Sequence, residues 1–189
     1  GVAWQNSEGF YYSSYDKPAE GSDLSGITQH HKLYFHKLGT SQDEDQLIFG
    51  GEDTPRRYIG GSLTEDQRFL VISAAVSTSG NELYIKDLEN NGPILPAVKN
   101  FDNDHYVVGN EGETLFIHTS LDAPNNRIIS VNAHQPGTEN WETLIPETEE
   151  PMTAGSAGKK IFASYLVDAK TSIKQFDYEG SLEREVELP

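Results

Sequence analysis

Four short apolar segments recur along this chain in a fixed arrangement, and this repeat constrains the fold more than any other feature. Each segment is rich in β-branched or aromatic residues and follows a turn that carries acidic residues or glycine, as strands entered from tight turns do. Phe10, Phe69, Leu115 and Ile161 mark the shared register, with separations of 59, 46 and 46 residues. The four segments read GFYYSS at 9–14, RFLVIS at 68–73, TLFIHT at 114–119 and KIFASY at 160–165.

Three further sets of predicted strands keep the same order within each unit. A leading segment precedes each marked strand, an alternating segment follows it, and a shorter apolar segment ends the unit. The alternating segments are KLYFHKL at 32–38, ELYIKDL at 82–88, RIISVNA at 127–133 and SIKQFDY at 172–178. Four strands per unit at this period, without helical periodicity, predict an all-β fold of β-propeller blades. A β-sandwich of 16 strands is the competing fold, but it does not require the units to share one internal order.

The repeat predicts about four consecutive four-stranded blades, at roughly 1–54, 55–103, 104–150 and 151–189. The first unit is longer than the others because it contains the polar segment KPAEGSDLSGITQ at 17–29. Its glycine, serine and proline residues predict a long surface loop. Long loops on a rigid scaffold often carry function, although the composition of this one indicates no particular chemistry.

The composition argues against several classes of partner. The chain has 30 acidic and 14 basic residues and a formal net charge of −16. This charge argues against nucleic acid or an anionic membrane as partner and favours a soluble protein. The chain contains no cysteine, and no apolar run approaches the ~20 residues that span a bilayer. Cytoplasmic and periplasmic locations both fit, and the first residue, Gly1, suggests a processed chain or a piece of a longer one.

The densest group of potential metal ligands is the segment HHKLYFHKLGTSQDEDQLIF at 30–49. We interpret His36 as a packing or hydrogen-bonding residue within a strand. His30 and His31 are adjacent, and adjacent strand residues point to opposite faces, which is poor geometry for one metal ion. The acidic residues at 43–45 fit a hairpin turn, where carboxylates accept hydrogen bonds from backbone amides. We therefore predict no metal site and no cofactor.

Candidate catalytic motifs fail on their spacing. The segment AGSAGKK at 154–160 lacks the gap and the Ser or Thr of a phosphate-binding loop. The segment GGSLT at 60–64 lacks the last glycine of a nucleophile elbow. The segment DNDHY at 102–106 lacks the glycine and the distal glutamate of a calcium loop. The sequence therefore predicts no catalytic residues in this chain.

The sequence resembles the propeller domain of the prolyl oligopeptidase family along nearly its whole length. The resemblance rests on HHKLYFHKLGTSQDEDQLIF, and it continues through PRRYIGGSLTEDQRFLVIS, NELYIKDL and NEGETLFIHTSLDAPNNRIISVN. It implies part of a seven-bladed propeller that caps an α/β-hydrolase domain. In this family Ser, Asp and His of the hydrolase domain cut after proline in short peptides, and the propeller acts as a size filter.

The same resemblance implies partners and contact residues. The expected partners are a C-terminal α/β-hydrolase domain of the same parent chain and oligopeptide substrates. Alignment of PRRYIGG and VISAAVSTSG places candidate substrate contacts at Tyr58 and Thr78. A ring of about four blades cannot close, so we also expect self-association through its open blade edges. The alternative function is a stand-alone propeller-like module that binds peptides or proteins.

Overall fold

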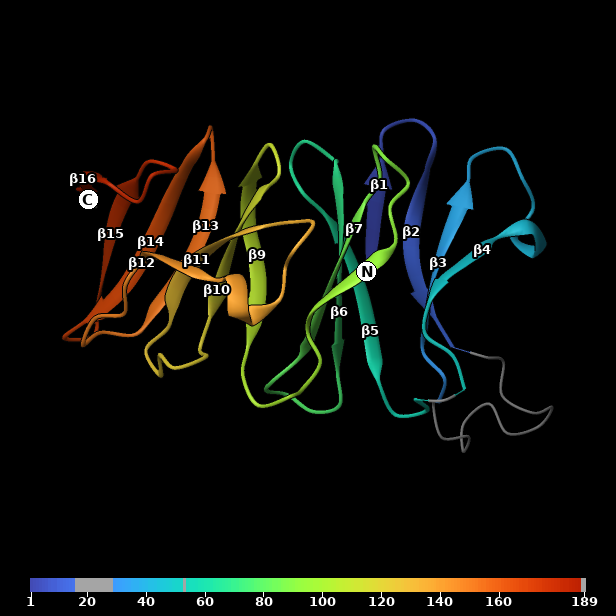
Figure 1. Cartoon of the computed structure of the whole chain (residues 1–189), viewed down its shortest axis with the longest axis horizontal. Coiled ribbons are helices and arrows are strands. Elements are labelled where there is room, and N and C mark those ends of the chain that lie inside the picture. Colours follow the sequence, from blue (N-terminus) through green and yellow to red (C-terminus); the bar gives the residue numbers. More distant parts are fainter. Residues whose placement is uncertain (16–28, 53, 188–189) are drawn as a thin grey trace.

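The computed structural model describes residues 1–15, 29–52 and 54–187, and it contains four antiparallel sheets side by side (Figure 1). The described residues form sixteen strands in these sheets, with two short 3-10 helices between strands. Nearly all of the loop predicted at 17–29 lies outside the described residues. No helix among the described residues is long and apolar enough to cross a membrane.

Each sheet consists of four strands that are consecutive in the sequence and neighbours in space. The first sheet contains β1 (Val2–Gln5), β2 (Gly9–Ser14), β3 (Lys32–Lys37) and β4 (Gln46–Phe49), with the helix η1 (Gln42–Glu44) before β4. The second contains β5 (Tyr58–Leu63), β6 (Phe69–Ala75), β7 (Glu82–Asp87) and β8 (Ile94–Val98). The third contains β9 (His105–Glu111), β10 (Thr114–Thr119), β11 (Arg127–Asn132) and β12 (Glu142–Ile145), with η2 (Thr138–Asn140) before β12. The fourth contains β13 (Met152–Ala157), β14 (Lys160–Val167), β15 (Lys170–Phe176) and β16 (Leu182–Val186).

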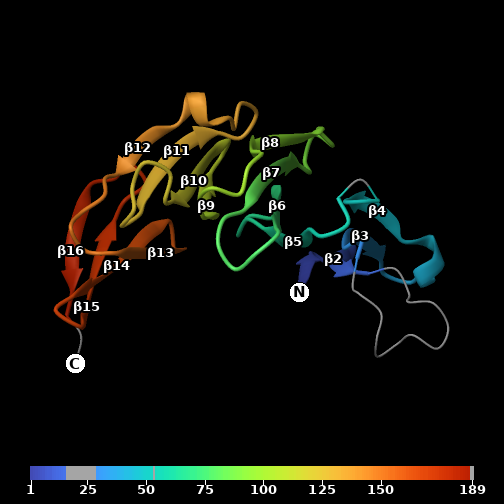
Figure 2. The same ribbon diagram turned by 90° about the horizontal axis from the view of Figure 1, so that it is seen from below.

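The four sheets fan out in an arc, and the first strand of each sheet lies on its concave side (Figure 2). This is the arrangement of propeller blades around a central axis, in an open ring. The all-β prediction and the predicted four-stranded blades are therefore confirmed. The third strand of every sheet also shifts register against the fourth, for example between Leu33 and Tyr34 and between Leu83 and Tyr84.

Strand alternation explains how the core is divided between sheets. Successive residues of a strand point to opposite faces, so one strand supplies two interfaces. In β6, Phe69 and Val71 join the apolar cluster between the second and third sheets, whereas Leu70 and Ile72 join the cluster between the first and second sheets. A third cluster, around Phe116, fills the space between the third and fourth sheets.

The two end sheets bury only one of their faces. Trp4 and Leu47 of the first sheet are 56% and 50% exposed, and Leu166 of the fourth sheet is 56% exposed. Leu166 follows the buried Tyr165 in β14, and the neighbours of Trp4 in β1 are only half-buried. The exposure at the two ends follows from the lack of a neighbouring sheet. The chain thus presents apolar side chains at both ends of the arc.

Candidate functional site

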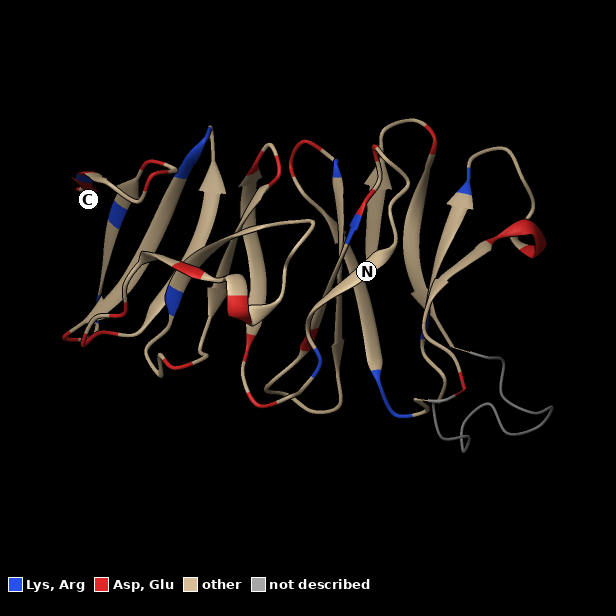
Figure 3. Cartoon of the chain, viewed as in Figure 1, with Lys and Arg blue, Asp and Glu red and all other residues tan. Residues whose placement is uncertain are grey.

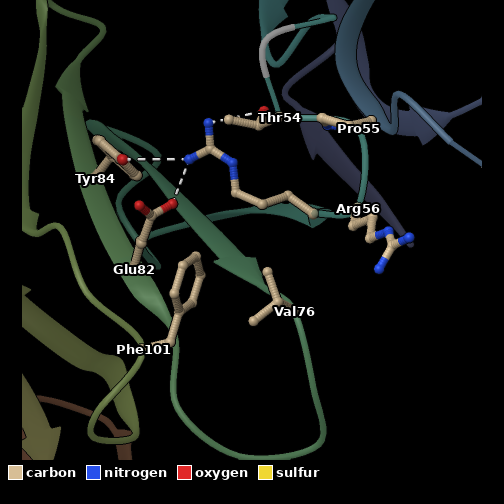
Figure 4. A pocket seen from close by; sticks show the side chains of 8 residues that line it. Thr54, Pro55, Arg56, Val76, Glu82, Tyr84 and Phe101 are labelled. Atoms are coloured by element: carbon tan, nitrogen blue, oxygen red, sulfur yellow. Dashed lines mark hydrogen bonds and ion pairs between the residues drawn. The ribbon is translucent and has the colours of Figure 1, made fainter.

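Two adjoining cavities lie where the first and second sheets meet, with the connections β4–β5 and β6–β7 close together (Figures 1 and 4). The first cavity has a volume of about 440 Å³ and is lined by Thr54, Pro55, Arg56, Arg57, Val76, Glu82, Tyr84 and Phe101. The second has a volume of about 240 Å³ and is lined by Tyr15, Gln29, His31, Pro55, Arg56, Arg57, Tyr58 and Val76. We call the two cavities together the groove.

Arg57 holds the wall of the first cavity together. Its guanidinium forms an ion pair with the buried carboxylate of Glu82, and it donates to the Thr54 hydroxyl at 2.9 Å and the Tyr84 hydroxyl at 3.4 Å (Figure 4). The guanidinium also lies 5.6 Å from the centre of the Phe49 ring. Because Glu82 is buried and charged, its pairing with Arg57 is a structural requirement. Burial, with Glu82 close by, raises the pKa of Tyr84 and keeps its hydroxyl protonated.

A glycine fixes the far wall of the first cavity. Gly80 has a φ of +75°, and a Cβ at this position would lie 1.8 Å from the carbonyl oxygen of Phe101. Only a residue without a side chain allows this approach. The close contact holds the turn after β6 against Phe101, whose ring lies opposite Val76 across the cavity (Figure 4).

The second cavity has aromatic walls from two different sheets. His31 stacks on Tyr15 with ring centres 4.3 Å apart, and its edge approaches Tyr58 at 6.3 Å. The backbone N–H of Ile59 donates to Nδ1 of His31 at 2.7 Å, which joins the segment before β3 to β5. Burial lowers the pKa of His31, so its ring is neutral near pH 7.

The two residues singled out by alignment have different positions relative to the groove. Tyr58 lines the second cavity and is 54% exposed. Thr78 is exposed in the turn between β6 and β7 and lines neither cavity. Their roles as substrate contacts stay predictions.

The three histidines of the first sheet have separate partners. His36 contacts Asp45 at 2.7 Å, and Asp45 also accepts a hydrogen bond from Tyr12 at 2.6 Å. His30 uses its backbone N–H to bond the carbonyl of Pro55, and His31 accepts from Ile59. Among the described residues, no group of three or more His, Cys, Asp or Glu side chains is arranged to hold a metal ion. The hydrogen-bonding role predicted for His36 is confirmed.

Sequence reasoning did not identify the arginines of the groove. The available signal was the segment PRR at 55–57, in which two neighbouring arginines follow a proline within an acidic chain. Figure 3 shows this basic segment between β4 and β5, surrounded by connections that carry mainly acidic side chains. The pattern alone does not reveal that one arginine pairs with a residue of the next hairpin, because Glu82 lies 25 residues further along the chain.

Comparison with known proteins agrees with this architecture. The sequence model of one protein family, described as the prolyl oligopeptidase N-terminal beta-propeller domain, matches residues 1–189. Prolyl endopeptidases from Elizabethkingia miricola and Elizabethkingia meningoseptica are 52% and 50% identical to the chain over its whole length. The chain spans 27% of the length of each of these relatives.

Solved structures show the same fold. One structure, from a study of two prolyl endopeptidases and their inter-domain dynamics, superposes with a TM-score of 0.89 at 27% identity, over 100% of this chain and 27% of its own. Prolyl oligopeptidase B from Galerina marginata superposes with a TM-score of 0.85 over 98% of this chain and 27% of its own, at 22% identity. The sixteen-strand architecture and the whole-length matches lead to one conclusion: the chain belongs to the prolyl oligopeptidase N-terminal β-propeller family.

Proposed function

We propose that this chain is the substrate-gating part of the propeller of a proline-specific serine endopeptidase that acts on oligopeptides. The observation that carries the proposal is the match along the whole chain, at 52% identity, to a prolyl endopeptidase of which the chain spans 27%. In the longer protein, an α/β-hydrolase domain would supply the serine, aspartate and histidine. The residues of this chain would bind and orient the peptide and limit its size.

The inner strands support such a gating role. β5 and β13 lie on the concave side of the arc, where they expose Gly60, Ser62, Thr153 and Gly155 (Figure 2). Apart from Tyr58 at the start of β5, these two strands present small, uncharged side chains that offer an extended peptide few points of attachment. The packed sheets on either side would exclude a folded protein by size.

Tyr58 and Thr78 are the proposed substrate contacts in this chain. The Tyr58 ring is half exposed beside a cavity and bounded by His31, so it offers an apolar surface to a peptide side chain. Thr78 offers a hydroxyl on an exposed turn. Both contacts would be remote from the reacting bond and would therefore contribute binding shared by the ground state and the transition state.

The test is Tyr58→Ala in the longer enzyme, assayed on long and short proline peptides. Loss of a half-exposed aromatic contact should cost about 1–2 kcal/mol, or roughly 5- to 30-fold in kcat/KM. KM should rise more than kcat falls, and the effect should disappear for peptides too short to reach Tyr58.

Leu38→Ala provides a matched control for this test. Leu38 is 44% exposed, near the 54% of Tyr58, but it lies in the turn after β3 and lines neither cavity. It should leave the kinetics of both peptides unchanged. An equal loss for Tyr58→Ala on long and short peptides would mean that Tyr58 only supports the fold, and no loss on either would remove it from the site.

We also propose that the end faces of the arc associate when the chain is isolated. In the longer protein these faces would pack against further blades of the ring. In isolation, Trp4 at one end and Leu166 at the other are both 56% exposed and would favour contact between copies. A stand-alone interaction module is the less favoured function, because the relatives matched by the whole chain are much longer proteins.

A further inference from the structure

Two neighbouring arginines at the groove, Arg56 and Arg57, differ in whether their guanidinium groups are paired. Arg57 is engaged by Glu82, Thr54 and Tyr84, as described above. Arg56 is exposed, and within the part of the chain that the structure describes it has no hydrogen-bond or ion-pair partner. Its side chain points away from the Arg57 cluster (Figure 4). As far as the described residues go, the Arg56 guanidinium is therefore available to a ligand.

Arg56 is placed where the two cavities meet. Together with Pro55, Arg57 and Val76 it lines both of them. Glu82 is the acidic residue among the described lining residues, and its charge is already balanced by Arg57. The described lining of the groove is consequently positive at this point, in a chain whose formal net charge is −16.

His31 supplies a second donor in the second cavity. Its Nδ1 accepts the hydrogen bond of the Ile59 N–H at 2.7 Å, so in the neutral ring the proton is on Nε2. The N–H at Nε2 can donate to an oxygen of a ligand. Tyr15 and Tyr58 stand on either side of the imidazole and provide apolar surface next to these donors.

We propose that Arg56 binds a carboxylate of the peptide substrate, so that the groove selects peptides with an acidic side chain remote from the scissile bond. This inference rests on the proposed function. A guanidinium offers paired N–H donors that match the two oxygens of a carboxylate. The aromatic rings beside Arg56 would hold the apolar part of the same peptide segment. In a chain of formal net charge −16, Arg56 is one of few groups that can attract a carboxylate, so its replacement should have a clear effect on selection.

The experiment compares three peptides of equal length in the longer enzyme, with Glu, Gln or Lys at one position distant from the proline. The wild-type enzyme should cleave the Glu peptide about 2- to 5-fold better in kcat/KM than the Gln peptide, the range expected for an exposed ion pair. Arg56→Gln should abolish this preference, and Arg56→Glu should shift it toward the Lys peptide. Higher ionic strength should weaken the wild-type preference.

Lys159→Gln is the matched control, because it changes the net charge equally at an exposed position in the turn between β13 and β14. It should keep the preference for the Glu peptide. Equal cleavage of the Glu and Gln peptides by the wild-type enzyme would overturn the inference. A lower melting temperature and a uniform loss on all three peptides in Arg56→Gln would also overturn it, because Arg56 would then pair with another part of the protein.

The outcomes separate this inference from the proposed function. Cleavage of the Gln peptide after proline, without any effect of peptide charge, would leave the proposed function in place and remove only the role of Arg56. Failure of the wild-type enzyme to cleave any of the three peptides would overturn both.

Discussion

Asp87 joins the second and third sheets through a buried carboxylate, and its replacement gives a strong test of how the arc is held together. Its side chain is 4% exposed. One oxygen accepts from the backbone N–H groups of Glu89 and Asn90, at 2.9 and 3.4 Å. The other contacts Arg68 at 3.2 Å, the Asn90 side chain at 3.0 Å and Nε2 of His134, which follows β11, at 2.9 Å.

The perturbation is Asp87→Asn, which keeps the shape of the side chain and removes its charge. Both oxygens face donors, so either orientation of the amide places its NH₂ group against an N–H. Removal of one partner from a buried ionic network typically costs about 3–5 kcal/mol. We expect a loss of this size in the free energy of unfolding, because Arg68 would remain largely buried with less compensation.

The assay is urea unfolding of the chain, followed by circular dichroism and by the fluorescence of Trp141, which packs against the cluster between the second and third sheets. Glu89→Gln is the control, because Glu89 pairs with the same Arg68 but is 69% exposed. It should change stability by less than about 1 kcal/mol. A change below about 1 kcal/mol for Asp87→Asn as well would refute the reasoning, since a desolvated carboxylate cannot be removed so easily.

The effect of pH gives a second reading of the same variant. Burial alone raises the pKa of Asp87, but hydrogen bonds from His134, Asn90 and Arg68 outweigh it and hold the pKa well below its usual range. A carboxyl with a lowered pKa stabilises the fold above its unfolded pKa, about 3.9, and this stabilisation is lost as the pH falls through the folded pKa. The difference between wild type and Asp87→Asn should therefore shrink only below about pH 4.

Two further predictions concern the wall of the groove and the end faces. Gly80→Ala should lower stability by about 1–3 kcal/mol, because its Cβ would collide with Phe101 at a positive φ, whereas Gly60→Ala has open space and should be nearly neutral in thermal unfolding. The isolated chain should associate with rising concentration in sedimentation experiments, and Trp4→Ser combined with Leu166→Ser should reduce this; a monomer at every concentration would contradict the proposal.

The strands were predictable because their signal is local. A buried strand requires apolar residues at short range, and a turn requires glycine or a polar residue, so the repeat of turn and strand is visible in the sequence itself. Leu115 and Ile161, which mark the register, are fully buried and face the preceding sheet. Phe69 is also fully buried but faces the following sheet, so Leu70 and not Phe69 occupies the equivalent place in the second unit. Phe10 is only half-buried, because its side of the first sheet faces no neighbouring sheet.

The groove was less predictable because its contacts join distant parts of the chain. The pair of Arg57 and Glu82 and the bond from Ile59 to His31 each connect residues more than twenty positions apart. The sequence shows two equivalent arginines in PRR, and only the fold distinguishes them. The acidic turn joins the antiparallel strands β3 and β4, as expected for a hairpin, and Glu44 accepts from the backbone N–H of Ser41. The sequence did not show that Asp45 binds the side chains of His36 and Tyr12.

The groove and the junction of the first two sheets are physically coupled. The strand ladders of the described residues lie within the individual sheets, so neighbouring sheets are joined mainly by apolar packing and by side-chain bonds such as that from Asn110 to Asp66 at 2.7 Å. Apolar packing is not directional. The angle between two neighbouring sheets is therefore sensitive to the few extra contacts that a bound peptide would add. The second cavity takes Tyr15 and His31 from the segments flanking β2 and β3, and Tyr58 from β5. A peptide held there would touch both sheets and stabilise their junction, and by linkage any change that loosens the junction would weaken peptide binding.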